Sequence, residues 1–259
     1  MPVHGRCLMR RTASGITLLV CLLLAMLAAG CGEDNSDGGA DIPEPVPTTV
    51  DTEPDEPRTC GTDDECFTYE QAQDIYNRTI KFVAPYFEEV YENPPKPNAY
   101  RYIATGETAD SVCGQNDSSV LAYCPGDSNI YIGQDSLWEI YSSSTGGDAG
   151  IATVLAHEYG HHLQSSAGVP EAQTERETIP SENQADCVAG AWVAWADGKN
   201  FFATGEENEI LGTLESAASA EGPNRDHGTA GERLEAIQLG FEGGLGECNA
   251  FYSRTPLIN

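Results

Sequence analysis

The sequence has few basic residues. It contains 13 lysines and arginines against 41 aspartates and glutamates in 259 residues, a formal net charge of −28 at pH 7. Removing the first 30 residues, which hold Arg6, Arg10 and Arg11 and no acid, changes the balance to 10 against 41, or −31. A chain with this much negative charge repels nucleic acid and anionic lipid headgroups. Neither is therefore an expected partner. The simpler interpretation of the acidity is that it keeps the protein soluble.

Long hydrophobic runs are also lacking, apart from one near the amino terminus. Residues 16–29 form an apolar run that follows Arg10 and Arg11, an arrangement typical of an export signal. The run is too short to predict a membrane-spanning helix. We therefore expect the protein to be exported.

The end of this apolar run resembles a bacterial lipobox. It reads Leu27-Ala28-Ala29-Gly30-Cys31, and departs from the usual pattern at Ala28, where leucine is common. Residues 1–30 are accordingly predicted to be a lipoprotein signal peptide, and Cys31 the lipidated residue. The mature protein would then be anchored to a membrane of the bacterial cell envelope, on its periplasmic or extracellular face. Cleavage near Ala29 that leaves Cys31 as an ordinary thiol is the alternative.

No C-x-x-C pair occurs among the nine cysteines, which disfavours a thiolate metal site. Cys7 and Cys21 leave with the signal and Cys31 takes the lipid, so six cysteines stay in the mature chain. An even number in an exported protein predicts disulfides. Sequence alone permits fifteen connectivities for six cysteines. We favour pairing neighbours, which gives Cys60–Cys66, Cys113–Cys124 and Cys187–Cys248.

The chain divides into a tether and one folded domain. Residues 31–59 are rich in proline and acids and almost without apolar side chains, so they are predicted to be a disordered spacer. Residues 60–259 are predicted to form an α+β domain that is predominantly helical, with a small sheet and disulfides. Its expected helices span 69–91, interrupted or kinked at Pro85, then 135–142, 149–166, 181–197, 206–220 and 229–240, and its expected strands span 100–103 and 129–133.

A metal-binding motif lies in the expected helix 149–166. His157, Glu158 and His161 form H-E-x-x-H. Residues four apart lie on one face of a helix, so both imidazoles reach one zinc ion. Glu158 is offset around the helix, which places its carboxylate to act as general base on a water molecule. Only four histidines follow the signal and three lie in this helix, which favours a metal site over chance.

A third ligand is expected from the helix that follows. Glu182 and Asp186 are again four residues apart and share a helix face. Glu182 is the expected zinc ligand, and Asp186 the expected acceptor for the outer N–H of a zinc-bound imidazole. The alternative is an exposed first helical turn with Ser181 as its N-cap.

Together these motifs resemble a known family. H-E-x-x-H followed by E-x-x-x-D is similar to the gluzincin class of zinc peptidases, and more narrowly to the bacterial family of predicted neutral zinc metallopeptidases. The residues that carry the match are Tyr123–Asp127, Ile130–Ile132, Leu155–Gln164, Gln184–Gly190, His227–Thr229, Glu232, Arg233 and Cys248. The resemblance implies a zincin-like domain with His157, His161 and Glu182 as zinc ligands and Glu158 as catalytic base. Members often carry one N-terminal membrane helix, so a lipid anchor departs from the family.

We therefore expect a zinc-dependent hydrolase that acts on a peptide or protein substrate. His227, which precedes the last expected helix, is a candidate donor to the developing oxyanion, or else a loop histidine that caps the helix. The alternative from another functional class is a non-catalytic, zinc-stabilised surface lipoprotein that binds a partner. Glu158 argues against that alternative, because a structural zinc site is closed by four protein ligands and needs no base.

Overall fold

The computed structural model describes residues 66–143, 147–220, 222 and 225–258, which belong to one compact unit, Glu53–Asn259. The predicted signal peptide, Cys31, the tether and Cys60 lie outside the described residues. Within these residues, no helix combines the length and apolarity needed to cross a membrane.

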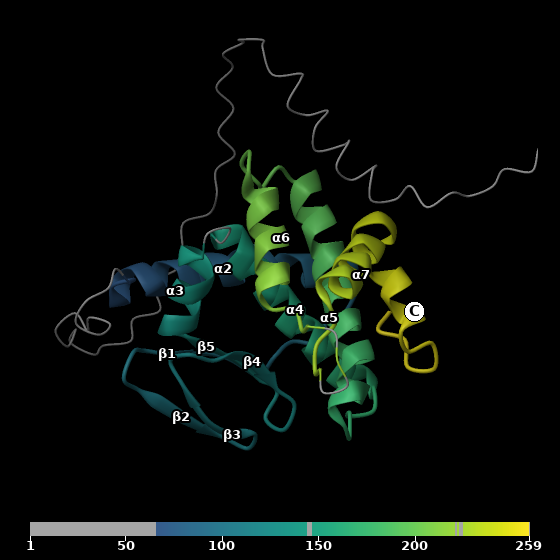
Figure 1. Ribbon diagram of the computed structural model, residues 1–259, viewed down its shortest axis with the longest axis horizontal. Helices are drawn as coiled ribbons and strands as arrows, with labels where there is room; N and C mark the ends of the chain where they lie inside the picture. The colour runs from purple at the N-terminus through teal and green to yellow at the C-terminus, as the bar shows by residue number, and fades with distance from the viewer. Residues whose placement is uncertain (1–65, 144–146, 221, 223–224, 259) are drawn as a thin grey trace, which may run out of the picture. The chain divides into compact units, whose positions relative to one another are not determined.

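The described residues form a predominantly helical α+β fold, as predicted (Figure 1). In chain order the elements are α2 (Tyr69–Val90), β1 (Ala99–Ile103), β2 (Thr108–Ser111), β3 (Gly114–Asp117), β4 (Leu121–Cys124), β5 (Asn129–Gly133), α3 (Gln134–Ser142), α4 (Asp148–Ala167), α5 (Glu175–Gly198), α6 (Glu206–Ser216), α7 (Ala230–Gly243) and the 3-10 helix η1 (Leu245–Ala250).

The main sheet has three strands in the order β1-β5-β4. β1 and β5 run parallel, with Ala99 opposite Asn129, and β4 pairs antiparallel with β5. β2 and β3 form a separate antiparallel hairpin. The two expected strands are confirmed as β1 and β5. β2, β3 and β4 were not expected from the sequence, because each has only four residues and lacks a strong apolar alternation.

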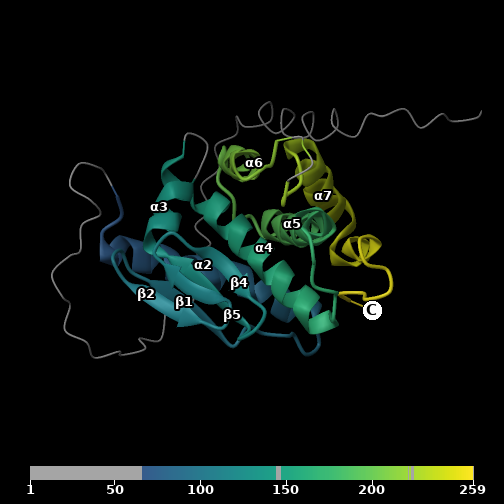
Figure 2. The same cartoon turned by 60° about the horizontal axis from the view of Figure 1, so that its bottom comes forward.

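Helix α4 is the centre of the structure. It packs against α2, α3, α5, α6 and β4, and Figure 2 shows it running between the sheet on one side and α5 and α7 on the other. Because neighbours surround it, its buried residues lie on every face rather than along one stripe. Gly168 ends the helix in a left-handed conformation, which glycine adopts without steric cost.

Two prolines lie inside helices, and one of them, Pro85, was expected to interrupt or kink its helix. Pro85 lies in α2, which continues to Val90 instead of breaking. Pro180 lies near the start of α5, which begins at Glu175 and not at residue 181. Proline removes one backbone hydrogen bond. Buried residues on both sides of Pro85, and the buried residues that follow Pro180, offset that loss. Ser181 is therefore inside α5, and its predicted alternative role as an N-cap is wrong.

Helices α5 and α7 cross at unusually short range. A Cβ at Gly190 would lie 2.0 Å from the carbonyl oxygen of Ile237, and one at Gly240 would lie 1.8 Å from that of Cys187. Neither position has room for a side chain. The close approach brings residues of α7 against the part of α5 that carries Glu182 and Asp186.

Two of the three favoured disulfides are formed in the described structure. Cys113 pairs with Cys124, which ties the tip of the β2–β3 hairpin to the end of β4. Cys187 pairs with Cys248, which joins α5 to η1. Cys187 follows Asp186 directly, so a covalent link joins this part of α5 to η1.

Candidate metal centre

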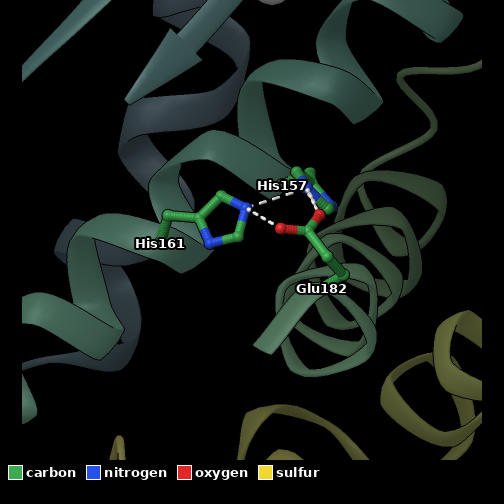
Figure 3. Close-up of side chains that lie close together, drawn as sticks. All are labelled: His157, His161 and Glu182. Atoms are coloured by element: carbon green, nitrogen blue, oxygen red, sulfur yellow. Dashed lines mark hydrogen bonds and ion pairs between the residues drawn. The ribbon is translucent and has the colours of Figure 1, made fainter. Parts of the chain in front are cut away.

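His157 and His161 lie one turn apart on α4, and their rings face a common point (Figure 3). The two Nε2 atoms are 3.1 Å apart. His157 is buried and His161 is partly buried. The geometry is the one the sequence predicted from their spacing.

Glu182 of α5 reaches the same point from a second helix (Figure 3). Its Oε2 lies 3.2 Å from Nε2 of His157, and its Oε1 lies 3.4 Å from Nε2 of His161. One donor atom from each of the three residues lies within 4.8 Å of the others. Across the described part of the chain, this is the one group of His, Cys, Asp and Glu donors close enough to hold a metal ion.

The three donors fit a zinc ion. Ligand distances of about 2.0–2.1 Å in a tetrahedral site separate neighbouring donor atoms by about 3.3–3.4 Å, close to the separations of 3.1, 3.2 and 3.4 Å found here. Oε2 of Glu182 is buried and accepts no well-aligned hydrogen bond, as expected for an oxygen whose partner is a cation. Two histidines and one glutamate form a ligand set of catalytic zinc sites, which keep one position open.

The electrostatics of the site favour a positive charge at this point. Burial opposes protonation of His157, but Asp186 and Glu182 beside it outweigh burial and raise the pKa of the imidazole to about 10. Burial favours the neutral form of Glu182, but the adjacent imidazoles outweigh it and hold the pKa of the carboxyl well below its usual range. The carboxylates that favour a proton on His157 would equally favour a metal cation bound in its place.

Each imidazole is oriented from its outer side. Nδ1 of His157 lies 2.8 Å from Oδ1 of Asp186, where the sequence analysis placed that carboxylate. Nδ1 of His161 lies 2.9 Å from Oε1 of Gln164, and the Gln164 amide donates to the backbone oxygen of Ser181. Acceptors at both Nδ1 atoms keep the hydrogens there and leave each Nε2 lone pair free for a metal.

Two of these orienting residues were not assigned by sequence reasoning. Gln164 follows His161 at a spacing of three, a helix-face signal that was available. Arg233 of α7 binds the far side of Asp186. Both residues belong to the motifs that carry the family resemblance, but nothing in the sequence shows that α7 lies against α5.

Glu158 is not part of the ligand group, and its carboxylate is hydrogen-bonded to the sheet. Its Oε2 accepts a hydrogen bond of 2.8 Å from the backbone N–H of Tyr123 in β4. The hydroxyl of the same tyrosine lies 3.2 Å from Nδ1 of His162, so Tyr123 contacts α4 at two points. The backbone donor, which the sequence could not reveal, fixes the carboxylate next to the metal position without placing it among the ligands.

His227 lies at the edge of the site, in the loop before α7. Its Nε2 is 3.5 Å from Oε2 of Glu182, and its side chain is 40% exposed. Nδ1 lies 3.0 Å from Oδ1 of Asp226. The helix cap that follows is made by Thr229 and Glu232, not by His227. The structure thus places His227 beside the ligands but outside the group that could hold a metal.

Comparison with known proteins gives a family and distant relatives. The family model described as "Putative neutral zinc metallopeptidase" matches residues 4–251. "Uncharacterized protein YpfJ" of Escherichia coli K12 is 29% identical over 194 residues, which cover 64% of this chain and 65% of the relative. "Uncharacterized protein Rv2575" of Mycobacterium tuberculosis H37Rv is 31% identical over 197 residues, which cover 56% of this chain and 67% of the relative. The chain therefore spans slightly less than two thirds of its Escherichia coli relative. No solved structure matches.

Proposed function

The chain belongs to the family of neutral zinc metallopeptidases, and from this premise we propose that it hydrolyses peptide bonds at the site on α4 and α5. The observation that carries the proposal is the convergence of His157, His161 and Glu182 next to a separately held carboxylate, Glu158. His157, His161 and Glu182 would hold the ion. When bound, zinc supplies a Lewis acid that acidifies water and polarises a carbonyl.

Glu158 is the proposed general base. The Tyr123 N–H binds Oε2 and leaves Oε1 to accept a proton from the attacking water. The same oxygen then delivers that proton to the leaving nitrogen, so the carboxylate ends the cycle ionised. This use of one group in both steps requires a fixed position, which the hydrogen bond from β4 provides.

His227 is the proposed donor to the oxyanion that forms at the substrate carbonyl. Its exposed imidazole lies beside Glu182, and the Asp226 carboxylate accepts from Nδ1 and orients the ring, so Nε2 donates to the oxyanion in the form in which both ring nitrogens carry hydrogens. A donor that is aimed where negative charge develops stabilises the transition state more than the substrate. This proposal replaces the helix-cap alternative, because Thr229 supplies the cap.

Strand β4 is the proposed guide for the substrate. It is an edge strand of the main sheet, and its Tyr123 N–H faces Glu158. An extended peptide that adds to such an edge gains backbone hydrogen bonds and runs past the catalytic carboxylate. A peptide or protein substrate fits this edge better than a small amide, which would leave it unused.

We also propose that the protein is an exported lipoprotein anchored through Cys31. Support comes from the basic and apolar signal and the lipobox-like sequence. Metabolic labelling with a fatty acid analogue should mark the wild-type chain and not a Cys31→Ser variant. Labelling of both chains, or of neither, would contradict the anchor.

Zinc content and peptide cleavage, measured on the same preparation, test the proposed activity. We expect about one zinc per chain, cleavage of a fluorogenic peptide mixture, loss of cleavage with a chelator and recovery on adding zinc. A protein that holds zinc, needs it for stability and cleaves no peptide in the mixture would support the non-catalytic binding module instead. A folded protein that binds no zinc would contradict both.

A further inference from the structure

Arg233 of α7 is a buried arginine that contacts Asp186 of α5. It is 5% exposed, and its guanidinium makes three hydrogen bonds that the structure defines. Nε donates to Oδ2 of Asp186 at 2.9 Å and Nη2 donates to Oδ1 at 2.8 Å. Nη1 donates to the backbone oxygen of Ala217 at 2.8 Å, just after α6 ends. The arginine therefore joins three helices through one planar group.

Asp186 connects this arginine to the metal position. The carboxylate is fully buried, and the same Oδ1 that accepts from Arg233 lies 2.8 Å from Nδ1 of His157. A carboxylate held by one hydrogen bond can rotate about its side-chain torsions. A bidentate guanidinium fixes the plane of the carboxylate, and so fixes the direction in which it orients the imidazole.

The two metal-binding histidines differ in this respect. His161 is oriented by the neutral amide of Gln164, which is itself tied to Ser181. His157 is oriented by the charged Asp186, which is held in turn by the charged Arg233 of α7. The side chain of His157 is 9% exposed against 20% for His161, so water has less chance to replace a lost partner at His157.

We propose that Arg233 is a positioning residue for the metal centre, which fixes Asp186 and through it the His157 imidazole. This inference rests on the proposed zinc site. The positive charge of Arg233 would by itself weaken cation binding, but Asp186 neutralises it in direct contact. Loss of the arginine alone leaves a buried carboxylate without its counter-ion and with freedom to turn, so the orienting effect dominates.

Zinc dissociation constants of the full-length chain, measured by competition with a chromophoric chelator, test the proposal. Arg233→Met should bind zinc about 10–100-fold more weakly, the usual effect of removing such an outer partner. Arg233→Lys should fall between Arg233→Met and wild type, because one ammonium cannot reproduce the planar fork. Arg225→Met removes the same charge from a nearby arginine that pairs with Glu232, and should bind zinc like wild type.

A second readout separates positioning from general damage to the fold. Cobalt substituted for zinc should show a changed visible spectrum in both Arg233 variants and an unchanged one in Arg225→Met. If Arg233→Met fails to fold, the double variant Arg233→Met/Asp186→Asn removes both charges of the pair together and serves in its place. Its zinc affinity should be no lower than that of Asp186→Asn, because Arg233 supports zinc binding only through Asp186.

Several outcomes would overturn the inference. Zinc affinities of the Arg233 variants within about twofold of wild type would show that Asp186 needs no support. A further loss of affinity in the double variant, beyond Asp186→Asn, would show that Arg233 does not act through Asp186. Absence of zinc binding by wild type would overturn the metal centre itself, and this inference with it.

Discussion

The backbone N–H of Tyr123 in β4 donates a hydrogen bond of 2.8 Å to Oε2 of Glu158 in α4. A main-chain donor cannot be lost by changing a side chain, and it comes from a strand that forms part of the sheet. The proposed base is thus held by the fold, whereas the proposed ligands His157 and His161 are oriented by side chains.

Replacement of Glu158 by glutamine should abolish most activity without loss of zinc. The amide oxygen still accepts from Tyr123, but the group no longer takes a proton, so turnover should fall by about 10²–10⁴-fold. Fluorogenic peptide cleavage and metal analysis measure the two effects. Glu235→Gln, an exposed change on α7, is the control and should leave both unchanged. Undiminished turnover in Glu158→Gln would exclude this residue as the base.

Replacement of His227 by alanine should lower turnover and spare the metal. His227 lies outside the donor group, so zinc affinity should stay at the wild-type value, while kcat should fall by about 10²–10³-fold if one oxyanion donor is lost. Steady-state kinetics and chelator competition measure these quantities. A large loss of zinc would instead identify His227 as a ligand, and unchanged kinetics would leave it no role in catalysis.

Replacement of Gly190 by alanine should destabilise the fold. The added Cβ would lie 2.0 Å from the backbone oxygen of Ile237, a distance that forces α5 and α7 apart. We expect a loss of about 1–3 kcal/mol or more in the free energy of unfolding, measured by denaturant titration. Gly198→Ala, where no atom lies within 4 Å, is the matched control in the same helix and should cost little. Equal stability of the two variants would contradict the close crossing.

Acid sensitivity should depend in part on Glu232. A hydrogen bond from Arg225, with one from the backbone of Thr229, lowers the pKa of this carboxyl to about 2. Because the folded pKa is depressed, the contribution to stability is present above the unfolded pKa of about 4.5 and is lost as pH falls toward 2. Glu232→Gln can keep the capping geometry but cannot ionise. Its melting temperature should therefore fall less than that of wild type over this pH range, and parallel curves would contradict the assignment.

The sequence predicted the helix that carries the candidate metal ligands because the signal for that helix is local. The spacing of His157 and His161 fixes their common face on any helix, and Glu182 is in turn fixed relative to Asp186. The start of α5 was predicted at residue 181, although it lies at Glu175, because the residues before Pro180 carry no buried apolar pattern that would signal a helix. Strand β4 was missed because four residues carry little periodicity.

The residues that orient the site could not be predicted from the sequence for a different reason. Asp186 could be assigned to a histidine, but Arg233 is 47 positions further along the chain and Tyr123 acts through its backbone. Both contacts depend on which helices and strands become neighbours. Neighbours are decided by packing, such as the crossing at Gly190 and Gly240, which no single-residue pattern reports.

The bond between Cys187 and Cys248 ties α5 to the C-terminal segment independently of any metal ion. It pins the residue after Asp186 to the C-terminal segment, and it does so whether or not an ion is bound. Removal of an ion from the proposed site should therefore leave α5 joined to η1, so the position of Asp186 should depend little on zinc.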